Sequence, residues 1–494
     1  MRCSSRFRSG GRAPVRRDTR IARVAALAAA AVLLTAPAAA QRAAQMGVRV
    51  RDYVRVDAPV VVLTHVKLID GTGAPARDDQ TIVIRDGRIA AVGPAASVQL
   101  PAGADVHDLS GHTVIPGLIG LHDHLFYTAA GGRSAQLTET GPRLYLGSGV
   151  TTVRTTGSRA PYAEINLKEG IELGQVPGPR IHITAPYITG GRGSNTMTLI
   201  NSPEEARRFV AYWGEEGATW VKAYTNIGST QLKAAIDEAH AHGLKVTGHL
   251  CSVSFREAVA LGIDNLEHGL FTNSDYVADK EADRCPSGLA ARVGSIDVNA
   301  TDVRETFRAM IDNGVAMTST LAVYELFVPN RPTQDERTLR AMAPEVRQDY
   351  LAARRQIDEG GRTSYTLEML KNAMAYEKAF FDAGGLLAAG VDPTGNGGAL
   401  PGFGDQRNYE LLIEARFTPA QVVQIMTLNG ARVLGIDREL GSIEPGKIAD
   451  LVVMPGDLTA DPARIRGVTL VFKDGIGYDA VKLIDDTTGR VGIS

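Results

Sequence analysis

Along most of the chain, short apolar runs rich in β-branched residues alternate with longer segments whose apolar positions recur every three or four residues. Runs of the first kind predict buried strands, and segments of the second kind predict amphipathic helices. Strands are expected at 113–122, 151–154, 180–184, 219–224, 245–249, 264–268, 315–320 and 386–392. Helices between them are expected at 203–214, 230–242, 301–313 and 367–383. This βα alternation favours an α/β fold, a (β/α)8 TIM-type barrel over residues 111–435, with a doubly wound open sheet as the alternative.

The two ends of the chain have a different pattern of apolar and turn-forming residues. Residues 58–110 alternate short β-rich runs with turns, and Asp86-Gly87 is a typical hairpin turn. Residues 436–485 show the same alternation of short β-rich runs and turns. We therefore predict that both segments fold together into one small β-sandwich domain.

Residues 1–40 have the pattern of a cleavable export signal. Eight arginines accompany an apolar run over residues 24–34, and the alanines at 38–40 offer a cleavage site. The apolar run is too short to span a bilayer, so we expect a periplasmic or secreted protein without a stable membrane anchor. A membrane anchor or a disordered basic tail is the alternative. Arg16-Arg17 leaves twin-arginine export open.

The charge and the cysteines of the remaining chain narrow its partners. Without residues 1–40, 45 basic and 54 acidic residues remain, a formal charge near −9, which argues against nucleic acid. Only Cys251 and Cys285 remain there, so at most one disulfide can form, and a thiol-based zinc site is not expected. A small molecule is the expected partner, and homo-oligomer formation is left open.

Side chains that can bind metal lie at the ends of five predicted strands. They are His122, His124, Lys222, His249, His268 and Asp392. His122 and His124 point to the same side, because side chains alternate along a strand. Lys222 interrupts an apolar strand, where an unpaired ammonium would be costly. Each residue alone is more often a core or surface side chain, but together they predict one site on one face of the barrel.

This pattern resembles the amidohydrolase superfamily, in particular its binuclear members with a carboxylated lysine. Supporting motifs are Val-Ile-Pro-Gly-Leu at 114–118, Gly-Val-Thr-Thr-Val-Arg at 149–154 and Gly-Ser-Ile-Glu-Pro-Gly-Lys at 441–447. The stretch 400–411 resembles the exported branch of prolidase-like dipeptidases, imidazolonepropionase-like hydrolases and ochratoxin-type amidases.

The resemblance implies two divalent metal ions, with zinc expected, and a metal-activated hydroxide. His122, His124 and Asp392 would hold one ion, and the other two histidines would hold the second. Lys222, as a carbamate, would bridge the two ions. Asp392 would also be the catalytic base, which takes the water's proton and passes it to the leaving amine.

The reaction implied is hydrolysis of a C–N amide bond in a small substrate such as a dipeptide or an N-acyl amino acid. A lactonase or cyclic-amide hydrolase on the same metal centre is one alternative, and a catalytically inactive barrel scaffold is another. A Ser-His-Asp hydrolase is disfavoured, because the chain has no G-x-S-x-G motif.

The chain departs from its relatives at two sites. Arg-Thr-Thr at 154–156 stands where relatives often carry Arg-Asp, and Arg192 stands where many carry the histidine of a Gly-Gly-His motif. Arg192 could bind a substrate carboxylate with two hydrogen bonds, or it could be a solvated loop residue. Arg416 occupies a place where a helix C-cap glycine would be natural, so backbone strain is expected there.

Two stretches, 273–298 and 324–363, are longer than ordinary connections. The second is expected to be helical over 334–343 and 345–359. Loops that follow barrel strands overhang the active face, so the two could form a lid. A solvated helical hairpin or a self-association surface is the alternative.

Overall fold

The computed structural model describes residues 43–191, 196–332, 335–361 and 363–493. The predicted export signal and Arg192 lie outside these residues. No helix in the described part of the chain is both long and apolar enough to span a membrane.

Residues 118–389 contain two sheets of parallel strands. One sheet has the order β11 (Arg180–His182), β10 (Val150–Thr155), β7 (Leu118–Asp123). The other has the order β13 (Thr198–Leu199), β12 (Thr184–Thr189), β14 (Trp220–Tyr224), β15 (Lys245–His249), β16 (Asn265–Glu267), β17 (Ala316–Ser319), β18 (Leu387–Ala389). The first and last predicted strand regions meet where the Asp392 N–H donates to the His122 carbonyl at 2.7 Å. The predicted α/β class is confirmed, and every expected strand region contains a strand.

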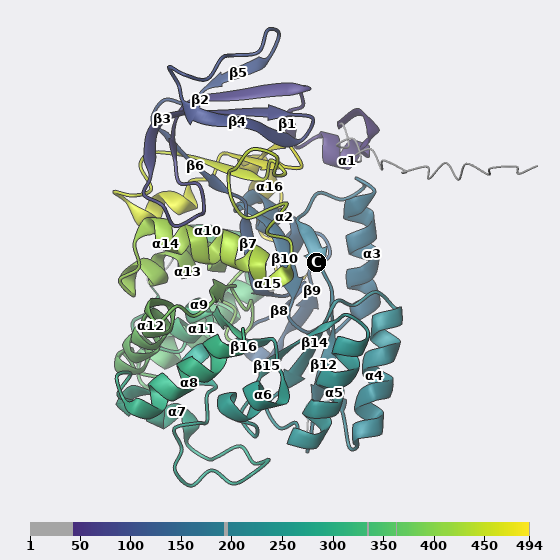
Figure 1. Ribbon diagram of the computed structural model, residues 1–494, viewed down its shortest axis with the longest axis vertical. Helices are drawn as coiled ribbons and strands as arrows, with labels where there is room; N and C mark the ends of the chain where they lie inside the picture. The colour runs from purple at the N-terminus through teal and green to yellow at the C-terminus, as the bar shows by residue number, and fades with distance from the viewer. Residues whose placement is uncertain (1–42, 192–195, 333–334, 362, 494) are drawn as a thin grey trace, which may run out of the picture. The chain divides into compact units, whose positions relative to one another are not determined.

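Helices lie between these strands in the chain and after the last of them. They are α2 (Thr140–Gly147), α3 (Pro161–Glu172), α4 (Pro203–Glu215), α5 (Ser229–Ala241), α6 (Phe255–Leu261), α8 (Thr301–Asp312), α12 (Leu367–Asp382), α13 (Phe403–Glu414), α14 (Pro419–Gln424) and α15 (Gly430–Leu434). Figure 1 shows α3, α4 and α5 along one flank of the parallel strands. Helix α4 starts where expected, because the Ser202 hydroxyl accepts from the Glu205 N–H and Pro203 follows. The four predicted helices are confirmed to within one residue at each end.

Strands from both chain ends form one mixed sheet. Within the described residues it has nine strands, in the order β1, β21, β20, β19, β6, β2, β3, β4, with β5 paired to β2. Figure 1 shows β1 to β6 in the upper part of the picture. Their bounds are β1 (Val54–Val56), β2 (Val60–Leu68), β3 (Arg77–Arg85), β4 (Arg88–Pro94), β5 (Asp105–Asp108), β6 (His112–Pro116), β19 (Leu451–Pro455), β20 (Leu470–Lys473) and β21 (Ile476–Asp479). Asp86 and Gly87 turn the β3–β4 hairpin with positive φ, as predicted. The prediction that the two ends of the chain fold together is therefore confirmed.

The prediction of a single strand at 113–122 is wrong, because one strand ends before Gly117 and a second strand begins after it. Strand β6 pairs with β19 in the mixed sheet, and β7 pairs with β10 among the parallel strands. A Cβ atom on Gly117 would lie 2.2 Å from the Thr151 hydroxyl oxygen, so the chain can pass there only as glycine. The apolar pattern continues across the break because both halves are buried.

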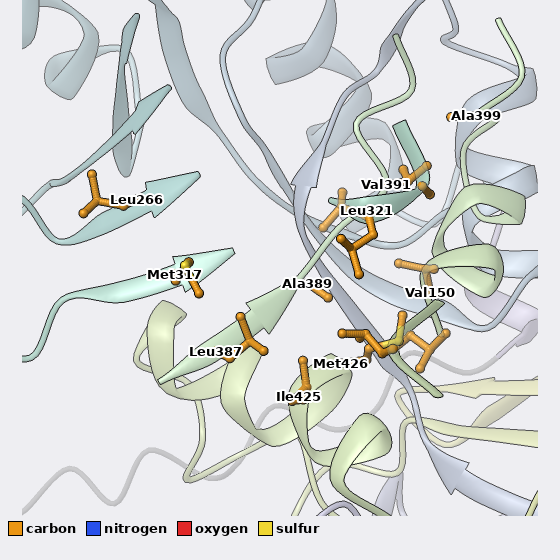
Figure 2. Packing of buried hydrophobic residues seen from close by; sticks show 14 of the residues in the cluster. Val150, Leu266, Met317, Leu321, Leu387, Ala389, Val391, Ala399, Ile425 and Met426 are labelled. Atoms are coloured by element: carbon orange, nitrogen blue, oxygen red, sulfur yellow. The ribbon is translucent and has the colours of Figure 1, made fainter. Parts of the chain in front are cut away.

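The core is packed where the parallel strands meet the C-terminal helices. Figure 2 shows Leu266, Met317 and Leu387 on the neighbouring strands β16, β17 and β18. Ile425 and Met426, from a π-helical turn, pack in the same buried cluster. Each such side chain contributes on the order of 1.5–3 kcal/mol by burial, which holds the strands and their ends in place.

The two long stretches are folded. The first contains α7 (Leu289–Arg292) and is tied by a Cys251–Cys285 disulfide, the one that the composition permits. The second contains α10 (Glu336–Ala341) and α11 (Pro344–Asp358), so its predicted helices are confirmed; α9 (Leu321–Glu325) precedes them. The remaining elements are α1 (Val48–Arg51), α16 (Ala480–Asp485), β8 (Phe126–Thr128) and β9 (Ser134–Gln136). Arg416 has a φ of 73°, which confirms the expected backbone strain.

Candidate metal centre

The structure brings the six predicted side chains together at the carboxyl ends of the parallel strands. His122 lies near the end of β7, with His124 just beyond it. Lys222 is within β14, and His249 is the last residue of β15. His268 directly follows β16, and Asp392 lies just past β18. All are buried except His249, which is partly exposed.

The tightest part of this group combines two histidines and one carboxylate. Among the described residues, His122, His268 and Asp392 have ligating atoms that all lie within 4.8 Å of one another. The His122 Nε2 is 3.6 Å from one carboxylate oxygen of Asp392, and the His124 Nε2 is 3.4 Å from the other. The His249 and His268 rings are 4.4 Å apart. How the side chains divide between two ions stays a prediction.

Hydrogen bonds at the other ring nitrogen orient the histidines. The Nδ1 of His122 donates to Glu267 at 2.7 Å, and that of His124 donates to the Gly157 carbonyl at 3.3 Å. A carboxylate and a carbonyl can only accept, so both Nε2 atoms carry the lone pair that a metal requires. The Nδ1 of His268 bonds the Thr320 hydroxyl at 2.7 Å. Its Nε2 is buried, and no described residue is its hydrogen-bond partner.

The electrostatics keep the histidines neutral and Asp392 ionised. Burial lowers the pKa of His122, His124 and His268, and it lowers that of His249 to about 3 with help from the Lys222 ammonium. Burial alone would raise the pKa of Asp392, but its imidazole neighbours and the Thr394 hydroxyl hold it well below its usual range. Neutral imidazoles beside a carboxylate are a donor set that suits divalent zinc.

Lys222 is the least satisfied member of the group. Its Nζ is buried and has no hydrogen-bond partner in the described part of the chain, and it lies 4.0 Å from a Glu267 oxygen. Burial lowers its pKa to about 8. Among the described residues, the Lys222 Nζ and the His268 Nε2 are thus two buried polar atoms of the same site that no protein group hydrogen-bonds. The residues present therefore fit the expected metal ions.

Sequence analysis missed Glu267 and Arg154, which support the site from behind. The buried Glu267 carboxylate accepts from His122, from the Arg154 guanidinium at 2.6 Å and from the Asn265 amide at 2.9 Å. The Thr247 hydroxyl also donates to it. Arg154 is itself fully buried. An arginine at the end of an apolar strand was the available signal, because such a cation requires a buried acid.

Aromatic side chains flank the group. The Tyr187 hydroxyl is 3.4 Å from the His124 Nε2, and the Phe126 ring stacks on the His124 ring at 4.4 Å. On another side the Tyr324 ring lies 5.5 Å from that of His268 and stacks on Phe271 at 3.8 Å. Tyr324 belongs to the second long stretch, so that stretch contributes directly to the surroundings of the site.

Comparisons with known proteins agree on one family. The model of the family described as "Amidohydrolase family" matches residues 113–476. A dihydroorotase from Pelotomaculum thermopropionicum is 25% identical over 413 residues, which cover 78% of this chain and 87% of that protein. A solved Xaa-Pro dipeptidase with bound methionine in its active site is 21% identical, with a TM-score of 0.63, covering 85% and 100% of the two chains. The ochratoxinase of A. niger is 18% identical, with a TM-score of 0.60, covering 85% and 95%. At these identities the two structures show a common fold.

Proposed function

This chain belongs to the amidohydrolase family, whose members are hydrolases of C–N bonds, and we propose that it cleaves an amide bond in a dipeptide or an N-acyl amino acid. The proposal includes two divalent metal ions, with Zn²⁺ expected, and a carboxylated Lys222. The same membership implies that the parallel strands close into a TIM barrel. We further propose that the mixed sheet forms the β-sandwich domain beside it.

One observation carries the proposal. Three histidines have their Nδ1 atoms engaged, and the Nε2 atoms of His122 and His124 lie within 3.6 Å of the Asp392 carboxylate. A binding scaffold has no need for buried imidazoles held in this way around an ionised carboxylate. The arrangement supports a metal centre used for chemistry.

The chain's own residues supply the proton transfer and the positioning. Divalent ions held by the candidate ligands would supply a water of lowered pKa and a Lewis acid for the scissile carbonyl. Asp392, ionised at neutral pH, would accept the water's proton and pass it to the leaving amine. The Thr394 hydroxyl donates to one carboxylate oxygen at 2.8 Å, and the Asp392 N–H is bonded to His122, so the base is held in place.

Carboxylation of Lys222 would resolve the cost of its burial. An ammonium without hydrogen bonds is unfavourable there, and its lowered pKa makes the neutral amine accessible for reaction with carbon dioxide. The resulting carbamate would be an anionic oxygen donor in a group that otherwise offers mostly neutral nitrogens.

The second candidate is a cyclic-amide hydrolase or lactonase on the same centre. It is favoured by the dihydroorotase, whose name refers to a cyclic amide and of which the match covers 87%. Linear and cyclic substrates place the same carbonyl at the metals, so the centre itself does not separate them.

The test is a paired measurement of metal and activity. Purified protein supplemented with zinc is analysed for bound metal, then assayed with dipeptides and N-acyl amino acids for amine release, and with cyclic amides and lactones for ring opening. We expect bound zinc and amine release from the linear substrates. Ring opening alone would establish the second candidate. Protein that binds no zinc would favour the inactive scaffold.

We also propose that the protein is exported and acts in the periplasm or outside the cell. The Cys251–Cys285 disulfide supports an oxidising compartment. Cell fractionation, with N-terminal sequencing of the mature protein, tests this. Gel filtration with light scattering tests self-association.

A further inference from the structure

Arg159 is a cation beside the candidate metal centre that has no acidic partner among the described residues. It lies in the loop between β10 and α3. In the described part of the chain no carboxylate forms an ion pair with it, and its Nε atom is buried without a hydrogen-bond partner. Its one hydrogen bond there runs from Nη1 to the Ser134 hydroxyl at 2.9 Å. A guanidinium in this state keeps most of its capacity to bind an anion.

The position of Arg159 is set from two sides. Its guanidinium carbon lies 4.4 Å from the centre of the Phe126 ring, which stacks on His124 at 4.4 Å. A β-bridge between Ser158 and Pro186 brings the loop beside Tyr187, whose hydroxyl is 3.4 Å from the His124 Nε2. One aromatic ring therefore separates the unpaired cation from a candidate metal ligand.

Nearby arginines have an acidic partner, which Arg159 lacks among the described residues. Arg154, at the end of the same strand, is paired with Glu267 at 2.6 Å. Arg133, just before β9, is paired with Asp349 at 2.6 Å. Within the described ranges, the absence of an acid at Arg159 is therefore a local feature and not a general property of this face.

We propose that Arg159 binds the free carboxylate on the leaving-amine side of the substrate. The proposal rests on the proposed function and makes carboxylate-bearing amides the preferred substrate class. In a dipeptide or an N-acyl amino acid, that carboxylate carbon lies about 4 Å from the scissile carbonyl carbon, because three backbone bonds join them. A carbonyl held beside His124 would thus place its carboxylate within reach of a side chain one ring away.

The competing role is structural. Arg159 could merely join its loop to the β8–β9 hairpin through Phe126 and Ser134. A structural arginine would affect acid and amide substrates alike. A carboxylate-binding arginine discriminates between them, and its unpartnered Nε gains a bond only when the anion is bound.

The experiment compares matched pairs of substrates, each pair an N-acyl amino acid and its C-terminal primary amide. In the metal-loaded enzyme, Arg159→Ala is expected to raise KM for the acids about 10- to 100-fold, the loss typical of a charge-assisted hydrogen bond, with the amides changed less than twofold. Arg159→Lys should recover only part of the loss, because a point charge cannot make two parallel bonds. Arg133→Ala is the control and should leave both series unchanged.

Calorimetric binding of free amino acids and their amides gives a second reading that does not need turnover. Wild type should bind the acids more tightly, and Arg159→Ala should lose that preference. Equal effects of Arg159→Ala on acids and amides, in kinetics or in calorimetry, would overturn the proposal. So would a carboxylate-specific loss in Arg192→Ala with none in Arg159→Ala. If wild type cleaves no linear amide, the proposed function fails, and calorimetry alone then decides on the carboxylate site.

Discussion

Replacing Glu267 with glutamine tests whether the side chains behind the metal centre set its affinity. The substitution keeps the shape of the side chain and removes its charge. Of its four hydrogen-bond donors, two carry the argument: the His122 imidazole, whose Nδ1 donates to Glu267, and the Arg154 guanidinium, which loses its counter-ion. Both partners are buried, so water cannot compensate for the loss.

The expected magnitude follows from these two contacts. Removing one partner of a buried ion pair costs roughly 3–5 kcal/mol, because an uncompensated charge stays behind. Arg154 is fully buried and 2.6 Å from the carboxylate, so we expect a loss of about 3 kcal/mol in the free energy of unfolding. Losing the carboxylate that orients a ligating histidine typically costs 10- to 100-fold in metal affinity.

The assay measures the two effects separately. Urea unfolding of metal-free protein gives the stability, and zinc titration against a competing chelator gives the affinity. Glu325→Gln is the matched control: Glu325 is equally buried, but it pairs with Arg331 and Arg407 and with no candidate ligand. The control should lose stability and keep its zinc affinity. If Glu267→Gln binds zinc as tightly as wild type, the carboxylate does not orient His122 and the interpretation is refuted.

Three further changes are expected to have distinct effects. Lys222→Ala should lose bound metal and most activity, with partial recovery in added short carboxylic acids; unchanged metal content by elemental analysis would contradict a binuclear centre. Asp392→Asn should lower kcat by ~10²–10⁴ with most of the metal retained, since the amide can still ligate but cannot take a proton. Burial raises the pKa of Glu164 from its ordinary 4.5 to about 8, so the folded protein favours the protonated carboxyl group. The contribution of Glu164 to the free energy of unfolding is therefore largest below pH 4.5 and is lost as the pH rises through 8. In urea unfolding across this range, Glu164→Gln should make the slope of stability against pH shallower by up to about 1.4 kcal/mol per pH unit. Burial also raises the pKa of Glu377 to about 8 and that of Asp123 to about 7, and these two groups keep their own contributions in the variant.

The candidate ligands could be predicted from the sequence because their chemistry is local. A histidine or aspartate at the end of an apolar run is visible without knowing which strands are neighbours. The period of the runs places those ends on one face, and the structure brings His122, His268 and Asp392 together there. Helix ends were equally accessible, since Ser202 and Pro203 mark the start of α4 by their own geometry.

The residues behind the site could not be predicted in the same way. Glu267 contacts Arg154 across 113 positions of sequence and His122 across 145. The order of strands in the sheet brings these three residues together, and that order cannot be read from the pattern of apolar residues. The end of the strand at Gly117 could not be predicted for a similar reason. It depends on the close approach of Thr151, which leaves no room for a side chain at Gly117.

Two of the candidate ligands have a backbone conformation that sequence patterns do not reveal. His268 and Asp392 have φ angles of 69° and 50°, in the left-handed region that costs a residue with a side chain roughly 1–2 kcal/mol. The His268 N–H bonds the Thr318 carbonyl at 3.0 Å, and the Asp392 N–H bonds the His122 carbonyl at 2.7 Å, so neighbouring strands hold both turns. Glycine would relieve the strain but would remove the ligand. The strain therefore lies where the chemistry requires a side chain, and asparagine, which tolerates this region, makes Asp392→Asn a test of proton transfer that leaves the turn intact.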